Sequence, residues 1–226
     1  MRTGFSFHSE DDKREWQAFY ICPVFREQSC KKATAEFTPL SQTDCTYFVT
    51  YRLADSLPKL KLLDLQRQKA NWLRMHPKPW SSEIERDFHV LFDAQTERWL
   101  DDGYGSCLLK DRSVREIVEK SLLYSNGDLF HLWSYVVMPN HVHVLVKPFA
   151  ERSLVQIIQS WKSFSARNIN RLFNRSGRLW MNEYFDHAVR SERQLEHFRN
   201  YIASNPLLAH LPQESFSYRD FGGRFC

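Results

Sequence analysis

Two histidines separated by one valine are the first residues whose types and spacing could do chemistry. They are His141 and His143, in a β-branched run that reads HVHVLV. Alternate residues of a strand point to one face, so two steps of about 3.3 Å place both imidazoles side by side while Val142 points into the opposite layer. Such a pair can hold one cation. Two strand histidines also occur together by chance, and a barrel-type metallohydrolase, which uses the same triplet, needs a βα repeat that this chain lacks.

A tyrosine and an asparagine near the end of the chain form a second pair. Tyr201 and Asn205 lie in the run YIASNP, four residues apart, so on a helix they share a face. The amide oxygen of Asn205 suits a hard cation, and the phenol of Tyr201 can act as a nucleophile. A tyrosine on a terminal helix is more often a packing residue. The pair therefore gains functional meaning only if it lies beside the histidines.

Basic side chains gather in one segment, although the net charge of the whole chain is only +4. Residues 160–180 contain no acidic residue. Within them, Arg167, Arg171 and Arg175 recur every fourth residue and would form a basic stripe on a helix, as guanidinium groups suited to phosphate oxygens. A solvated helix face with distant acidic partners is the alternative. Phe164, in the same segment, is interpreted as a core residue.

The elements that must position these residues follow from hydrophobic periodicity and from turn residues. Four strands are predicted over residues 46–53, 129–138, 141–146 and 184–190, the middle two forming a hairpin. Helices are predicted over 59–74, 83–100, 111–124, from the N-cap Ser153 to about 174, and over 192–204, where Pro206 is expected to end the last helix. This order predicts an α+β, ferredoxin-like (split βαβ) fold: a four-stranded antiparallel sheet backed by helices, with a helical insertion and an added C-terminal helix.

Composition limits the classes of protein that the chain can belong to. Its 226 residues are 42% hydrophobic and 26% charged, which excludes wholesale disorder. No apolar run approaches the roughly 20 residues that span a bilayer, and the polar start is unlike a signal peptide. Five cysteines without a CxxC pair argue against a disulfide framework or a zinc ribbon. We expect a cytoplasmic protein with an extension at 1–44, a main domain at 45–211 that includes a helical insertion at about 59–124, and a tail at 212–226.

Four stretches together resemble a known family. They are MPNHVHVLV at 138–146, QSWKS at 159–163, the segment from Trp180 through YFDHAVR at 184–190, and NYIASNP at 200–206. In these stretches the chain resembles the REP-associated tyrosine transposases, a branch of the single-tyrosine, HUH-type insertion-sequence transposases. The run YRLADSLP at 51–58 also looks like the first strand of that branch, so the similarity extends from about Cys45 to Leu211.

The resemblance implies a role for each candidate residue. It makes His141 and His143 the metal-binding pair and Tyr201 the nucleophile, and it places Asn205 where the wider family has a glutamine that completes the metal site. The implied cofactor is a divalent cation, Mg²⁺ or Mn²⁺, and the implied substrate is single-stranded or hairpin DNA, cleaved through a 5′-phosphotyrosine link by a monomer or homodimer. The expected contacts to the DNA backbone are Lys162, Arg167, Arg171 and Arg175.

Several other residues and functions compete with this interpretation. Tyr184 is the rival nucleophile, although packing is its more frequent role. His187 and His197 do not occupy ligand positions of the family pattern, Asn140 is interpreted as a turn residue, and Asp186 as a structural hydrogen-bond acceptor. Two rival functions remain open: a module that binds DNA hairpins without cleaving them, and a metal-dependent hydrolase of small phosphoesters.

Overall fold

The computed structural model describes residues 45–149 and 152–222, so the predicted extension at 1–44 lies outside the described residues. The chain divides into two compact units. The first contains described residues 59–101, and the second contains residues 45–58 and the chain from 102 onward. Each unit is described by itself.

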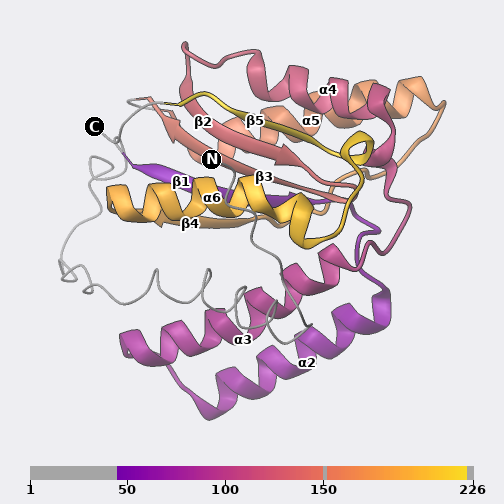
Figure 1. The fold of residues 1–226 in the computed structure, drawn as a ribbon. Helices are drawn as coiled ribbons and strands as arrows, with labels where there is room; N and C mark the ends of the chain where they lie inside the picture. Colours follow the sequence, from indigo (N-terminus) through magenta and orange to yellow (C-terminus); the bar gives the residue numbers. More distant parts are fainter. Residues whose placement is uncertain (1–44, 150–151, 223–226) are drawn as a thin grey trace. The chain divides into compact units, whose positions relative to one another are not determined.

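A five-stranded antiparallel sheet forms the centre of the larger unit (Figure 1). Its strands are β1 (Thr46–Arg52), β2 (Phe130–Val137), β3 (His141–Pro148), β4 (Phe185–Val189) and β5 (Ser217–Asp220), in the spatial order β4-β1-β3-β2-β5. The helices are α4 (Arg112–Leu123), α5 (Leu154–Leu172) and α6 (Glu192–Leu208), with short 3₁₀ turns η3 (Leu108–Lys110) and η4 (Gln213–Ser215). The first four strands have the order of the predicted ferredoxin-like fold, which is thereby confirmed.

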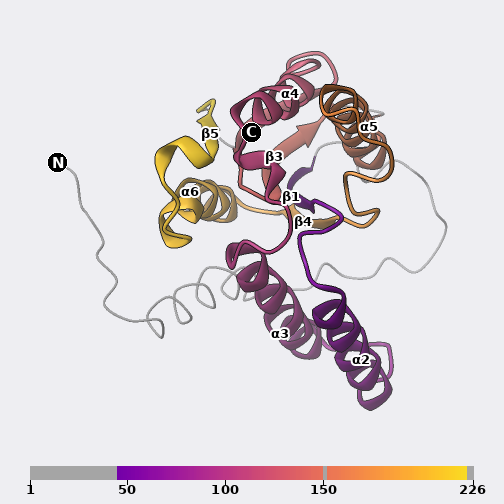
Figure 2. The ribbon, with the colours of Figure 1, turned by 90° about the vertical axis from the view of Figure 1, so that its right-hand side faces the viewer.

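The two faces of the sheet have different coverings, as Figure 2 shows: α4 and α5 lie on one side and α6 on the other. Strand alternation explains this division. Val142, Val144 and Val146 point toward α4 and α5, where they join one apolar core with Ile158 and Trp161. The alternate residues of β3, which include both histidines, therefore face α6.

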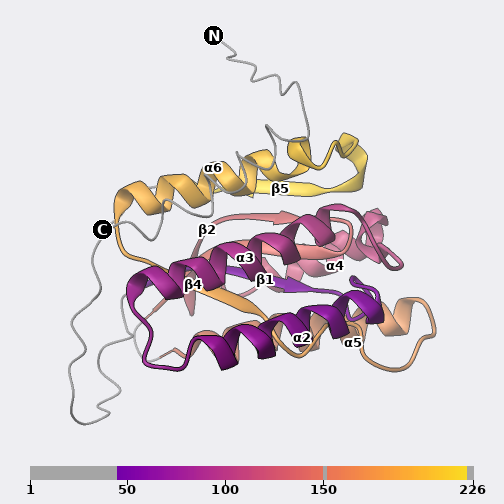
Figure 3. The same ribbon diagram turned by 90° about the horizontal axis from the view of Figure 1, so that it is seen from below.

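A fifth strand lies in the stretch that was expected to be a tail. β5 pairs with β2 and lies beside α6 (Figure 3). Two arginines fasten this segment to the rest of the unit. The buried Arg115 donates to the carbonyl oxygen of Glu214 (2.6 Å) and to the hydroxyl of Ser217 (3.1 Å). Arg199 of α6 donates twice to Asp220 of β5, at 3.1 and 2.8 Å.

The last helix does not end where the sequence predicted. α6 continues through Pro206 to Leu208, because a proline can adopt helical φ and loses only the hydrogen bond to the carbonyl of Ile202. Burial of Pro206 and Leu208 offsets that loss. The N-cap was predicted correctly: the Ser191 hydroxyl accepts from the backbone N–H of Gln194 at 3.3 Å.

The smaller unit is a pair of helices, α2 (Lys59–Met75) and α3 (Ser82–Asp101). Their aromatic side chains contact one another: the Trp72 ring centroid lies 6.0 Å from that of Phe92, and Phe88 lies 4.8 Å from Phe92. The third helix of the predicted insertion, α4, belongs to the sheet unit, where it packs on α5 and β2. In the described part of the chain, no helix combines the length and apolar character that crossing a bilayer requires.

Candidate functional site

The two histidines of β3 converge as the strand alternation predicted. The Nε2 atom of His141 lies 3.0 Å from the Nε2 atom of His143, and both side chains are fully buried. Burial lowers the pKa of His141 to about 3, and burial together with the neighbouring His141 lowers the pKa of His143. Both imidazoles are therefore neutral near pH 7 and can offer lone pairs to a cation.

Asn140 fixes which nitrogen of His141 carries the proton. Its amide nitrogen Nδ2 lies 3.2 Å from the carbonyl oxygen of Tyr104, and only the NH₂ end of an amide can donate to a carbonyl. The amide oxygen Oδ1 must then face Nδ1 of His141, 2.7 Å away, and it accepts a proton from that nitrogen. The other ring nitrogen, Nε2, is left without a proton and points at His143.

Thr50 of β1 can form a hydrogen bond with His143 whether or not Nδ1 of His143 carries a proton. Its hydroxyl Oγ1 lies 2.8 Å from Nδ1 of His143, and a hydroxyl can either donate or accept. When His143 is protonated on Nε2, that N–H donates to the bare Nε2 of His141 and Thr50 donates to Nδ1. If a cation were bound by both Nε2 atoms, His143 would carry its proton on Nδ1, and Thr50 would accept a hydrogen bond from it. Thr50 thus supports both arrangements.

The distance between the two nitrogens tests which cations the pair suits. Neighbouring donors around an octahedral ion with bonds of about 2.1 Å lie about 3.0 Å apart. Around tetrahedral zinc, with bonds of about 2.0–2.1 Å, they lie about 3.3 Å apart. The observed 3.0 Å is close to both values, so the pair suits a single divalent cation without selecting between these geometries.

Helix α6 brings the second predicted pair to the histidines. The ring centroid of Tyr201 lies 5.4 Å from that of His143, in an edge-to-face arrangement. The Nδ2 atom of Asn205 lies 3.4 Å from Nε2 of His143. Asn205 is buried, and its Oδ1 atom has no hydrogen-bond partner among the described residues. The oxygen and nitrogen of an amide side chain are assigned rather than observed. A rotated Asn205 would direct this oxygen toward the histidines, where it could be a third ligand atom for a cation.

One aromatic ring of β1 contacts both halves of the site. The buried Phe48 stacks on the ring of His143 at 5.5 Å and meets the ring of Tyr201 edge-to-face at 5.7 Å. On its far side it stacks on Phe198 of α6, at 4.5 Å. Phe48 therefore sets the spacing between the sheet that carries the histidines and the helix that carries the tyrosine.

The competing tyrosine, aspartate and histidines lie in other surroundings. Asp186 pairs with Val49 of β1, so it lies on the sheet face opposite to the histidines. Tyr184 contacts Lys162, whose Nζ atom lies 6.0 Å from the tyrosine ring. His187 and His197 each lie 5.4 Å from the ring of Phe198.

The predicted basic stripe does not lie on the face of the histidines, and it is shorter than expected. Arg167, Arg171 and Arg175 are exposed, but α5 ends at Leu172, so Arg175 follows the helix instead of continuing the stripe. Because α5 covers the face opposite to α6, these arginines do not share the face of the histidines (Figure 2). Lys162 is half-buried and donates to the carbonyl oxygen of Asn182 at 2.9 Å. Phe164 is 46% exposed, contrary to its interpretation as a core residue.

Three residues of the site escaped the sequence interpretation: Phe48, Thr50 and Asn140. Phe48 and Thr50 lie on the strand that pairs with β3, at alternate positions, which is the one signal that could have indicated them. The role of Asn140 depends on Tyr104, thirty-six residues earlier, so it could not be inferred from a local pattern.

A comparison with known protein families matches one segment of the chain. Residues 108–205 match the family model described as "Transposase IS200 like", and this segment contains His141, His143, Tyr201 and Asn205. Over this segment the match agrees with the resemblance to insertion-sequence transposases that the sequence motifs indicated. No protein with a curated description matches the chain.

Two solved structures are similar to the chain at a distance. One is a REP-associated tyrosine transposase bound to a REP hairpin, with a TM-score of 0.42 and 15% sequence identity over 77% of this chain and 73% of that chain. The other is a candidate transposase from Deinococcus radiodurans R1, with a TM-score of 0.33 and 15% identity over 78% of this chain and 98% of that chain. At this distance neither likeness bears on the activity of the chain.

Proposed function

Because residues 108–205 match the IS200-like transposases, we propose that this protein cleaves and rejoins single-stranded DNA at or near hairpins. One observation carries the proposal: the phenol of Tyr201, from the last helix, lies beside His143, whose Nε2 faces that of His141. A nucleophile and a cation-binding pair are the two parts that phosphodiester transfer requires.

Tyr201 is proposed as the nucleophile. Its oxygen forms a bond to the scissile phosphorus while the bond from phosphorus to the 3′ oxygen breaks. The phenolic proton leaves to solvent and the 3′ oxygen takes up a proton, so the products are a 5′-phosphotyrosine link and a free 3′-hydroxyl. Because the phosphodiester bond is exchanged rather than hydrolysed, a second 3′-hydroxyl can reverse the step and join strands without ATP.

His141, His143 and Asn205 are proposed to hold a divalent cation, Mg²⁺ or Mn²⁺. The facing lone pairs and the unpartnered Oδ1 atom of Asn205 support this assignment. A bound cation supplies charge stabilisation at the phosphate oxygens as the reaction proceeds. Asn140 keeps the Nε2 atom of His141 available for it.

Lys162, Arg167, Arg171 and Arg175 are proposed to contact the DNA backbone. The three arginines are exposed, and phosphate contacts of this kind position a strand without reading its sequence. Their place on and after α5 means that a bound strand extends from the histidine face around to the opposite face of the sheet.

A denaturing gel tests the proposal. Purified protein is incubated with labelled hairpin DNA that carries single-stranded flanks, in Mn²⁺ and in EDTA. We expect a protein-linked DNA band that requires Mn²⁺, disappears in Tyr201→Phe and persists in the matched variant Tyr184→Phe. Retarded binding without a linked band in any metal would instead identify a hairpin-binding module that does not cleave. Turnover of small phosphoesters that survives Tyr201→Phe would identify a hydrolase.

A further inference from the structure

An arginine at the end of β1 lies directly opposite the first histidine of the pair. Arg52 pairs with His141, and Thr50 pairs with His143. Residues opposite one another on antiparallel strands project to the same face, as the hydrogen bond between Thr50 and His143 confirms for the neighbouring pair. The Arg52 side chain therefore starts on the face of the histidines, at the edge of the site.

The guanidinium of Arg52 is half-buried and has spare hydrogen-bonding capacity. Its Nη1 donates to the hydroxyl of the buried Ser56 at 3.0 Å. In residues 45–149 and 152–222 no carboxylate forms an ion pair with it, although Glu183 is near enough to act on its charge. Burial lowers the pKa of Arg52 and Glu183 raises it, yet an arginine remains charged at any physiological pH. A held, half-buried guanidinium without an ion-pair partner is a ready site for an anion.

The backbone at Arg52 also contacts the chain segment that links α5, on one face of the sheet, to β4. Its carbonyl oxygen accepts from the backbone N–H of Met181 at 2.9 Å, and Leu53 forms a bridge with Trp180. The segment around Met181 leads from the end of α5 to β4, as Figures 1 and 2 show. Lys162 of α5 holds the next carbonyl of this segment, that of Asn182. Two positively charged side chains, Arg52 and Lys162, therefore lie between the histidine pair and the exposed arginines of α5.

We infer that Arg52 binds a phosphate of the DNA strand immediately beside the histidine pair, on the side from which the strand passes to α5. This inference rests on the proposed function, since it assigns a new contact to the same substrate. It adds a phosphate-binding residue that the basic segment at 160–180 does not contain. Lys162, nearer to the exposed arginines of α5, would contact a phosphate more distant from the cleaved bond.

Neutralising one phosphate of the DNA at a time tests the inference. Because the readout is binding, the test does not depend on cleavage. Binding of hairpin DNA is measured by fluorescence anisotropy in EDTA, with Tyr201→Phe as the parent protein. A set of otherwise identical DNAs each carries one neutral methylphosphonate. For the parent we expect one position beside the cleavage site where affinity falls roughly tenfold, as for loss of one hydrogen bond to a charged group. Adding Arg52→Gln should lower affinity for unmodified DNA by a similar factor and remove the sensitivity at that position alone.

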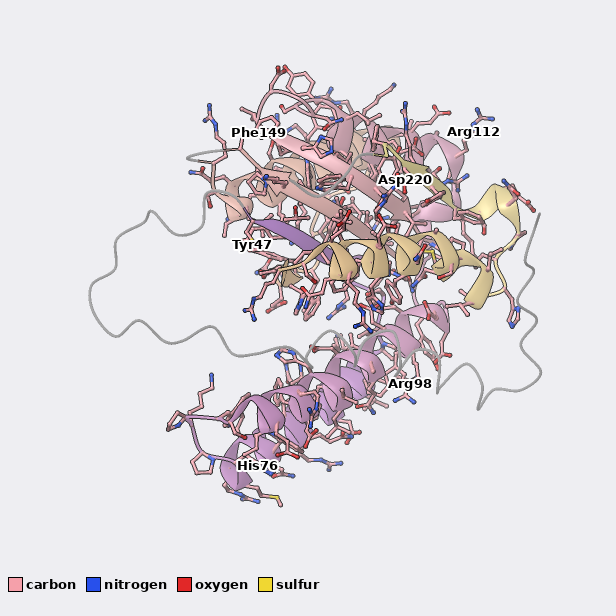
Figure 4. All side chains as sticks on the ribbon, turned by 60° about the vertical axis from the view of Figure 1, so that its left-hand side comes forward. Tyr47, His76, Arg98, Arg112, Phe149 and Asp220 are labelled. Atoms are coloured by element: carbon pink, nitrogen blue, oxygen red, sulfur yellow. The ribbon has the colours of Figure 1, made fainter. Side chains whose placement is uncertain are left out.

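Controls separate this contact from other effects. Arg112 lies on α4 and is 87% exposed, so Arg112→Gln should leave the methylphosphonate profile unchanged (Figure 4). Arg52→Lys keeps the charge and should retain part of the sensitivity, which guards against a folding defect in Arg52→Gln. A parent-like profile in a folded Arg52→Gln protein would overturn the inference. A wild-type protein that binds DNA but never forms the linked band would overturn the proposed function and leave this test valid.

Discussion

The amide of Asn140 sets the tautomer of His141 through a hydrogen bond of 2.7 Å from the ring nitrogen Nδ1 to Oδ1. The contact of the same amide with the Tyr104 carbonyl prevents the reverse orientation. Since Nε2 is the nitrogen that faces His143, this arrangement would leave the lone pair of His141 available to the proposed cation. A residue that looks like a turn former in the sequence therefore serves the proposed metal site.

Replacing Asn140 should weaken cation binding more than it weakens the fold. In Asn140→Ala the His141 ring can rotate and change tautomer, so we expect Mn²⁺ affinity to fall roughly tenfold to a hundredfold, as for other partners of metal-binding histidines. The measurement is a Mn²⁺ titration followed by electron paramagnetic resonance of the free ion. Asn140→Asp keeps the acceptor and should bind Mn²⁺ at least as well as wild type. Equal affinity in Asn140→Ala and wild type would exclude this role.

Phe48 should control the position of Tyr201. Phe48→Leu keeps an apolar side chain at a cost of about 1 kcal/mol in unfolding free energy, but it removes the ring that contacts both His143 and Tyr201. We expect formation of the protein-linked DNA band to slow at least tenfold, because small misplacements of a nucleophile are costly.

The matched control for Phe48 lies on the same strand. Tyr51 is buried on the opposite face of β1, and its hydroxyl has no hydrogen-bond partner among the described residues. Tyr51→Phe should leave the rate unchanged. If both variants slowed the reaction equally, the effect would belong to the core as a whole and not to the contact of Phe48 with the site.

The ion pair between Arg199 and Asp220 should make stability depend on pH. Burial raises the pKa of Asp220, but hydrogen bonds from Arg199 and from the backbone of Gly222 outweigh it and lower the pKa overall. A carboxylate with a lowered folded-state pKa stabilises above its unfolded pKa of about 3.9, and this stabilisation is lost as pH falls through the folded-state value. Asp220→Asn should therefore cost about 1–2 kcal/mol at pH 7, and the difference from wild type should shrink below about pH 4.

Urea unfolding at pH 7 and at pH 3 measures this difference. Glu196 is the control, because it contacts the same arginine at 2.7 Å but is 51% exposed. Glu196→Gln should change the unfolding free energy by less than about 0.5 kcal/mol at either pH. A cost for Asp220→Asn that is the same at both pH values would show that the carboxylate charge does not stabilise the fold.

The exposed arginines should govern the salt dependence of DNA binding. Each phosphate contact to single-stranded DNA adds about 0.7 to the slope of log affinity against log salt. Neutralising Arg167, Arg171 and Arg175 together should reduce that slope by about 2, as measured by anisotropy between low and physiological salt. Removal of Arg67 and Arg112, exposed arginines that pair with Asp64 and Glu116, should not. An unchanged slope in the triple variant would remove this surface from the interface.

The placement of the four candidate residues could be predicted because it follows from local periodicity. The alternation of β3 places His141 and His143 on one face, and helical spacing places Tyr201 and Asn205 together. Only the packing of α6 on that same face was beyond such rules. β5 was missed because its four residues, Ser217–Asp220, are mostly polar and have no strand pattern of their own. Its position comes from β2 and from the side chains of Arg115 and Arg199.

The errors on α5 and α6 have physical causes as well. Phe164 falls in an apolar helical pattern, but the core beneath α5 is already filled by Ile158, Trp161 and Ile169, and the ring remains at the surface. Pro206 is a helix breaker by propensity, yet the core contacts of α6 continue past it. In both places tertiary packing decides the outcome, and propensity describes only the isolated segment.

The pairing of β1 with β3 has a consequence for how the protein reaches its native state. Val49 and Val144 are neighbours in the sheet although nearly a hundred residues separate them, and the helices α2 and α3 lie between them in the chain. Closing so long a loop is entropically costly and slow. Phe48, Thr50 and His143 meet only once this pairing has formed, so the capacity to bind a cation should arise late during refolding and in a single kinetic phase.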